Sequence, residues 1–140
     1  MATIKSYTDI EQSKVLAEIL PLESTDMFCA DVFDKEKELH SYNFHILSTW
    51  GCKNFDELKE RENKFVQFIP CWSLAALLDI IPKHINEDNT LRIDVNENSF
   101  AIWYDEIGCG VNNDLPDITM ESAIDACVAM IEKLHEFKIL

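Results

Sequence analysis

Apolar residues recur along this chain in two spacings, one typical of helices and one typical of strands. Spacing of three and four residues runs through residues 9–20, 71–81 and 119–134, which predicts three main helices. Alternation at every second residue runs through residues 27–33, 40–47, 91–95 and 99–104, which predicts strands. The strands form two neighbouring pairs with short polar turns, so we expect an α+β fold with a small antiparallel sheet.

The most apolar segment, residues 65–82, lies near the middle of the chain. Pro70 or Ser73 can begin a helix there, and Pro82 prevents its continuation. We expect a buried central helix over about residues 71–81, with the other elements packed around it. One face of this helix carries Leu74, Leu77, Leu78 and Ile81.

The helices near the two ends have their own start signals. Thr8 and Glu11 have the spacing of a capping box for the first helix, which Pro21 ends. Thr119 is the expected cap of the last helix. The apolar stripe of the first helix comprises Ile10, Val15, Leu16, Ile19 and Leu20.

The two predicted hairpins cover residues 27–47 and 91–104. In the second, Phe100, Ile102 and Tyr104 share one face and Trp103 lies on the other, so this strand is expected to be central in its sheet. Asn54 is a candidate cap for a short helix over residues 55–61. Residues 65–69 favour a buried strand, and residues 105–117 form a loop.

The length of 140 residues indicates a single globular domain over residues 1–140. The five cysteines are odd in number and include no Cys-x-x-Cys pair, and the N-terminus has no basic and apolar signal pattern. These features predict a reduced, cytoplasmic protein.

The net charge of −14 is the strongest compositional feature. An acidic surface repels nucleic-acid phosphates and anionic lipids, so we expect no direct nucleic-acid partner and no membrane partner. The central helix is also too short to span a bilayer. The charge either serves solubility or matches a basic surface on another protein.

Two groups of residues raise the question of chemistry. Cys29, His40, His45 and Cys52 are of zinc-binding types, but their spacing matches no known pattern, so no metal or other cofactor is expected. Cys109 lies between two glycines in a loop flanked by carboxylates, which is not the positive setting of a reactive cysteine. A tight turn is the favoured interpretation, and no catalytic residue is predicted.

The aromatic residues offer a binding hypothesis. Trp72, Trp103 and Tyr104, together with Cys109, are the candidate ligand-binding residues, since indole rings can stack on a flat ligand such as a nucleobase. The alternative is that the aromatic rings fill the core of a small domain.

Three strings resemble stretches in uncharacterised small acidic proteins of gut Bacteroidales and their phages. They are PCWSLAALL over residues 70–78, TDIEQSKVLAEIL over residues 8–20, and DACVAMIEKL over residues 125–134. The resemblance covers about a third of the chain and carries no assigned function. It implies a cytosolic accessory protein, encoded on a phage, prophage or other mobile element.

Together these observations favour a non-catalytic accessory binding protein. It would act by contact with a protein partner or by sequestering a small, nucleotide-like ligand. One alternative is a small hydrolase or transferase that uses residues 105–117. Another is a structural or assembly protein that forms homo-oligomers through its C-terminal helix.

Overall fold

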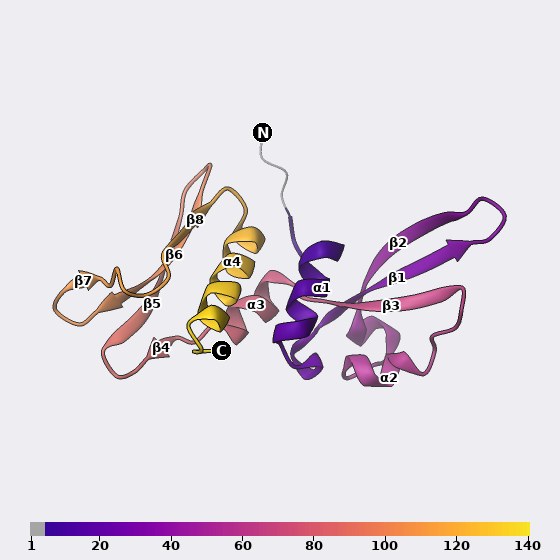
Figure 1. The fold of residues 1–140 in the computed structure, drawn as a ribbon, viewed down its shortest axis with the longest axis horizontal. Helices are drawn as coiled ribbons and strands as arrows, with labels where there is room; N and C mark the ends of the chain where they lie inside the picture. Colours follow the sequence, from indigo (N-terminus) through magenta and orange to yellow (C-terminus); the bar gives the residue numbers. More distant parts are fainter. Residues whose placement is uncertain (1–4) are drawn as a thin grey trace. The chain divides into compact units, whose positions relative to one another are not determined.

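The structure is a computed structural model that describes residues 5–140, in which four α-helices accompany two antiparallel sheets. This is the α+β class predicted from the apolar spacing. The described chain divides into two compact units (Figure 1). The N-terminal unit is Tyr7–Ala76, and the C-terminal unit is Leu77–Leu140 with residues 5–6. The expectation of a single globular domain over residues 1–140 stays a prediction.

The N-terminal unit contains the sheet of strands β1 (Met27–Asp34), β2 (Leu39–Ile46) and β3 (Val66–Cys71), in the order β2-β1-β3. The predicted hairpin over residues 27–47 is confirmed, with Met27 opposite Ile46. In its turn, the Asp34 carboxylate accepts hydrogen bonds from the amides of Glu36 and Lys37. This local bonding explains why a charged segment reverses the chain.

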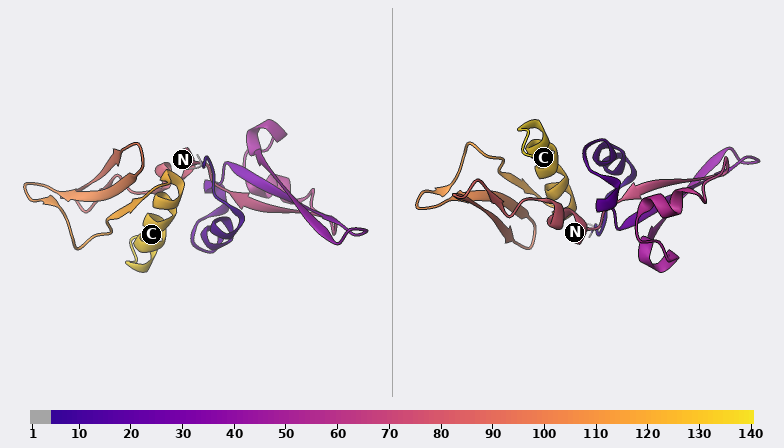
Figure 2. Two further views of the ribbon diagram at one scale, coloured as in Figure 1. Left: turned by 90° about the horizontal axis from the view of Figure 1, so that it is seen from above. Right: turned by 90° about the horizontal axis from the view of Figure 1, so that it is seen from below.

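Helices α1 (Ile10–Ile19) and α2 (Phe55–Lys59) lie on opposite faces of this sheet (Figure 2). Alternate residues of β1 therefore pack in two apolar clusters, one on each face of the sheet. The predicted cap of α2 is confirmed, since Asn54 accepts from the Glu57 amide at 3.1 Å. Short 3₁₀ turns, Leu22–Ser24 and Leu47–Trp50, flank the hairpin. The cluster on the α2 side comprises Phe28, Ala30, Leu47, Cys52, Phe55 and Leu58.

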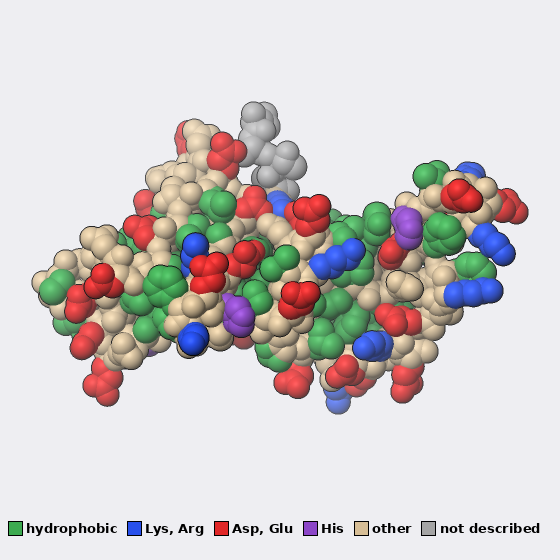
Figure 3. Space-filling view, viewed as in Figure 1, with side chains coloured by type: hydrophobic (Ala, Val, Ile, Leu, Met, Phe, Trp, Pro, Cys, Tyr) green, Lys and Arg blue, Asp and Glu red, His purple; other side chains and the backbone are tan. Residues whose placement is uncertain are grey.

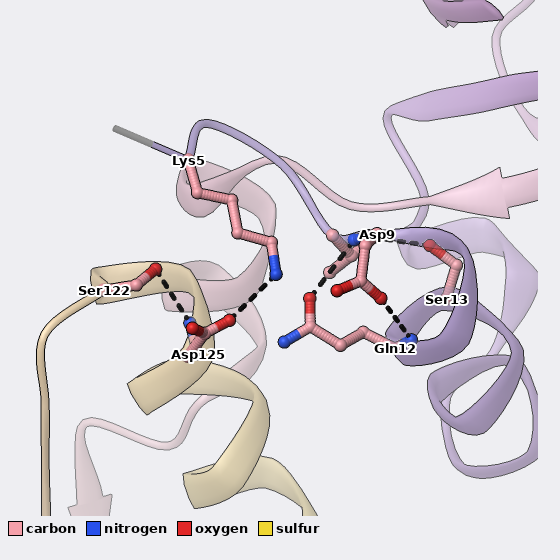
Figure 4. Close-up of polar contacts among 7 residues, drawn as sticks. Lys5, Asp9, Gln12, Ser13, Ser122 and Asp125 are labelled. Atoms are coloured by element: carbon pink, nitrogen blue, oxygen red, sulfur yellow. Dashed lines mark hydrogen bonds and ion pairs between the residues drawn. The ribbon is translucent and has the colours of Figure 1, made fainter. Parts of the chain in front are cut away.

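The capping box of α1 lies one residue later than predicted. Asp9 and Gln12 form it (Figure 4), rather than Thr8 and Glu11. Thr8 is buried, and its hydroxyl accepts a hydrogen bond from the Trp72 amide, 64 residues away. The hydroxyl is thus used in a tertiary contact, and the next residue becomes the cap.

The central helix is shorter than predicted. Helix α3 is Leu74–Ile80, not residues 71–81, because Cys71 still pairs with Met27 in the sheet. Ser73 accepts from the Ala76 amide at 3.2 Å, as expected of an N-cap. Leu77 and Ile81 are buried, whereas Leu74 and Leu78 are half-buried, so the apolar face predicted from spacing is only partly enclosed.

The C-terminal unit is a sheet with helix α4 (Ala123–Glu136) packed on it. Strand β6 pairs with β5, β7 and β8, so its predicted central position is confirmed. The alternation along β6 is also confirmed: Phe100, Ile102 and Tyr104 are buried, while Trp103 is half-buried. The strands are β4 (His84–Ile85), β5 (Asn89–Val95), β6 (Phe100–Glu106), β7 (Gly110–Val111) and β8 (Ile118–Met120).

Thr119 does not cap the last helix. It lies in β8, opposite Ala101, and α4 begins four residues later with Ser122 as its cap. Ser122 accepts from the Asp125 amide, and the Asp125 carboxylate pairs with Lys5 at 2.9 Å (Figure 4). Among the helices described for residues 5–140, none is long and apolar enough to cross a membrane.

Candidate functional site

Two of the four candidate ligand-binding residues lie in the core. Trp72 is fully buried, and its indole nitrogen donates to the Ser24 hydroxyl at 2.9 Å. Tyr104 is also fully buried; its hydroxyl donates to the Pro82 carbonyl at 2.7 Å, and burial raises its pKa far above the ordinary value. Their polar atoms are thus satisfied by the protein, as in the core alternative.

The other two candidates lie nearer the surface of the C-terminal unit. Trp103 is half-buried and donates its indole proton to Asp105 at 2.8 Å. Cys109 is exposed at the β6–β7 turn, where Gly108 and Gly110 have φ values of 79° and 77°. Positive φ values of this size favour glycine, which explains the two glycines and agrees with a tight turn. Trp72 belongs to the other unit, and a ligand-binding role for the four residues stays a prediction.

The four zinc-type residues are all in the N-terminal unit. Burial raises the pKa of the Cys29 thiol to about 11, and Cys52 is also buried. His40 pairs with an aspartate, and the His45 ring lies 5.2 Å from that of Trp50. Over residues 5–140, no group of three or more His, Cys, Asp or Glu side chains is arranged to hold a metal ion.

The strand edges of the N-terminal unit provide a different candidate site. The Phe33 amide donates to the Phe65 carbonyl, so Phe33 of β1 faces β3. The Leu47 amide donates to the Asp26 carbonyl, so Leu47, at the end of β2, faces β1. In an antiparallel pair these bonds alternate along each strand. The even-numbered residues of β2 therefore direct their N–H and C=O groups away from the sheet. They are His40, Tyr42, Phe44 and Ile46.

The opposite edge, on β3, is closed. The outward amide of Val66 donates to the Asn63 side chain at 3.0 Å, and that of Phe68 donates to Glu62 at 3.1 Å. The next outward position is Pro70, which has no N–H. Proline and local side chains are devices that prevent a further strand from pairing. Each outward position of β3 therefore uses one of them.

Strand β2 has no such protection. It is eight residues long and contains no Asp, Glu, Lys, Arg or Pro. Within the described part of the chain, no group hydrogen-bonds the outward amides of His40, Tyr42 and Phe44. At the end of the strand, the Ile46 carbonyl accepts from the Thr49 hydroxyl at 2.7 Å. This edge can therefore pair with another extended chain.

The side chains along the β2 edge form an aromatic row on the α1 face of the sheet. The Phe44 ring packs 4.6 Å from Tyr7, and the ring of His40 stacks on Tyr42 at 6.0 Å. His40 Nδ1 lies 2.7 Å from Asp31 Oδ1, which holds the imidazole in place. Next to this pair is a hollow of about 260 Å³, lined by Asp31, Phe33, His40, Lys64, Phe65 and Gln67.

The sequence alone does not identify β2 as a functional edge. The period-two pattern of residues 40–47 and their lack of charge are visible in the sequence, but the strand order is not. Comparisons with protein-family models, with curated proteins and with solved structures give no match to this chain. The resemblance to Bacteroidales and phage proteins therefore stays a prediction, and the open edge of β2 is the best-supported candidate site.

Proposed function

We propose that this protein is a non-catalytic binding protein that recognises an extended, basic segment of a protein partner by adding it as a strand to β2. The observation that carries the proposal is the contrast within one sheet: the β3 edge is closed at every outward position, whereas the β2 edge is open and uncharged. Strand addition uses main-chain hydrogen bonds for affinity and side-chain hollows for specificity.

The charge of the protein indicates the kind of partner. The N-terminal unit contains thirteen Asp and Glu residues against seven Lys and Arg, within a chain of net charge −14. Acidic side chains are spread over the visible face of both units (Figure 3). Such a field attracts a basic segment and repels a second copy of the same chain. A basic partner is therefore favoured over self-association at β2.

The side chains on the edge indicate the form of the segment. A paired strand places every second side chain on the α1 face, beside Tyr42, which is 47% exposed, and near the hollow at Asp31 and His40. Apolar residues at alternate positions match the exposed ring of Tyr42. Basic residues of the segment, at the positions between the apolar ones, match the negative charge of the protein.

The other hypotheses from sequence would use other parts of the chain. The apolar stripe of α4 is buried, so a homo-oligomer through the C-terminal helix would use the exposed residues Phe137 and Leu140 beyond it. A hydrolase or transferase would use the loop of Cys109, and a small ligand would need another hollow. An accessory protein from a phage that binds a host factor is consistent with an open strand edge.

The proposal is tested with three labelled eight-residue peptides of defined chemistry. One alternates Val with Lys, the second replaces Lys by Glu, and the third retains the Lys residues but carries two prolines that prevent strand pairing. We expect only the first to bind, by fluorescence anisotropy, with an affinity that falls as salt is raised. Equal binding of the proline peptide would show simple charge attraction and contradict strand addition.

A pair of variants with the same charge change locates the binding. Tyr42→Lys introduces a charge in the middle of the edge and should weaken binding of the Val-Lys peptide at least tenfold. Asn98→Lys introduces the same charge in an exposed turn of the C-terminal unit and should leave binding nearly unchanged. Equal affinities for the two variants would overturn the assignment of the site to β2.

A further inference from the structure

A second hollow, of about 460 Å³, lies within the C-terminal unit. Its apolar part comes from Leu78 at the end of α3 and from Leu91 and Ile93 of β5. The remaining lining includes Lys83, His84 and Arg92, all of which can carry positive charge. The volume is in the range of small-molecule sites, which combine apolar walls with a few polar groups.

The charge of this lining is opposite to that of its surroundings. The C-terminal unit has thirteen Asp and Glu residues and only five Lys and Arg, yet two of those five line the hollow. Among the described residues that border it, none is acidic. The hollow is therefore a local cationic site on an acidic unit, which favours an anionic ligand.

The cationic groups are held in place but keep hydrogen-bond donors free. Lys83 Nζ donates to the carbonyls of Leu78 and Ile81 near the end of α3, which leaves a third proton. Arg92 Nε donates to Asp105 at 3.2 Å, and in residues 5–140 its terminal nitrogens have no other partner. A planar guanidinium with free terminal donors suits a carboxylate.

The hollow also runs along an unpaired part of β5. The Leu91 amide donates to the Lys83 carbonyl at 2.9 Å, just before β4 begins, and the pairing between β4 and β5 stops at this bond. The next residue that faces this side is Ile93, which is 42% exposed. Beyond the cationic end, a ligand would therefore meet an apolar side chain and unpaired backbone groups.

We propose that this hollow binds a carboxylate joined to a short apolar chain, with the carboxylate at Lys83 and Arg92 and the apolar part on Leu91 and Ile93. The ligand is either a small aliphatic acid or the free C-terminus of an apolar peptide, which share this chemistry. The site is in the other unit from β2 and does not depend on the function proposed above.

The first experiment compares octanoate with octylamine by chemical-shift titration of the whole protein. Octanoate should shift the amides of residues 83–84 and 90–93 in a saturable way, and octylamine should not. The apolar chain is the same in both, so equal binding, or no binding of octanoate, overturns the proposal. A peptide ending in Val-Leu, with a free or an amidated C-terminus, distinguishes the sources: tighter binding of the free peptide than of octanoate identifies a chain terminus, and the reverse a small acid.

Three variants then test the residues. Arg92→Gln should weaken octanoate binding about fivefold, the effect of one exposed ion pair. Lys133→Gln makes the same charge change on the exposed side of α4 and should have little effect. Asp105→Asn removes the charge that competes for Arg92 while keeping an acceptor for Trp103, so binding should become tighter. Unchanged binding in both Arg92→Gln and Asp105→Asn contradicts the proposal.

Discussion

At the residue scale, burial raises the pKa values of three thiols, as it does that of the Tyr104 hydroxyl. Burial raises the pKa of Cys71 and of Cys127 to about 12, and that of Cys29 to about 11, from an ordinary value of 9.0. The Ser13 hydroxyl, which donates to Cys71 Sγ at 3.4 Å, opposes this rise without cancelling it. These thiols are core groups that stay neutral at physiological pH.

Stability should therefore fall as the pH rises above about 9. In the unfolded chain the three thiols lose their protons near pH 9, whereas in the native protein they keep them to about pH 11–12. The native state then binds more protons, so alkali favours unfolding, by up to about 1.4 kcal/mol per pH unit for each thiol. Urea unfolding between pH 7.5 and 11 measures this slope.

Two alanine variants provide the control for this pH dependence. Cys127→Ala should make the alkaline slope shallower, because one buried thiol no longer titrates. Cys109→Ala should leave the slope unchanged, since that thiol is exposed. The same slope in both variants would show that other groups cause the alkaline instability.

Local signals were sufficient for some residues and not for others. Asn54 and the alternation of Phe100, Ile102 and Tyr104 were predicted, because capping and strand alternation depend on near neighbours. Thr8 was predicted as a cap, but its hydroxyl bonds Trp72, a partner that no local pattern indicates. The burial of Trp72 likewise depends on tertiary packing.

At the scale of elements, the two hairpins followed from sequence, whereas the shorter strands did not. Strands β4, β7 and β8 have two or three residues each, too few for a periodic pattern. Residues 119 and 120 were assigned to the last helix for this reason, but together with Ile118 they pair with β6. The open edge of β2 also became visible only with the strand order.

Proline substitutions test the direction of the β2 backbone groups. Tyr42→Pro removes an outward amide and should cost little stability, because no hydrogen bond within the sheet is lost. Ser41→Pro removes an amide that faces Val32 on β1 and should cost about 1–3 kcal/mol. Thermal or urea unfolding of the two variants measures the difference. Equal losses would show that the assignment of inward and outward residues is wrong.

At the scale of the whole molecule, the question is whether the two units are one cooperative domain. The boundary between them falls within α3, which begins in one unit and ends in the other. The expectation of a single domain predicts that the two units unfold together in one transition.

A core variant in one unit tests this prediction of a single domain. Leu58→Ala leaves a cavity in the N-terminal unit and should cost about 2–5 kcal/mol. In one cooperative domain, hydrogen exchange should then accelerate in β5 and β6 as well as in β1 and β3. Unchanged protection of β5 and β6, with faster exchange in β1 and β3, would show two independent domains.

The sequence by itself determined the α+β class, both hairpins, the central place of β6 and the approximate extent of the terminal helices. These features depend on the spacing of apolar residues and on capping residues, both of which involve neighbours only a few positions apart in the sequence. Only the tertiary structure decided the division into two units, the late start of the central helix at Leu74 because Cys71 still belongs to β3, and the edges that stay open. Those features depend on which distant strands pair, and pairing is a property of packing between segments that no local spacing records.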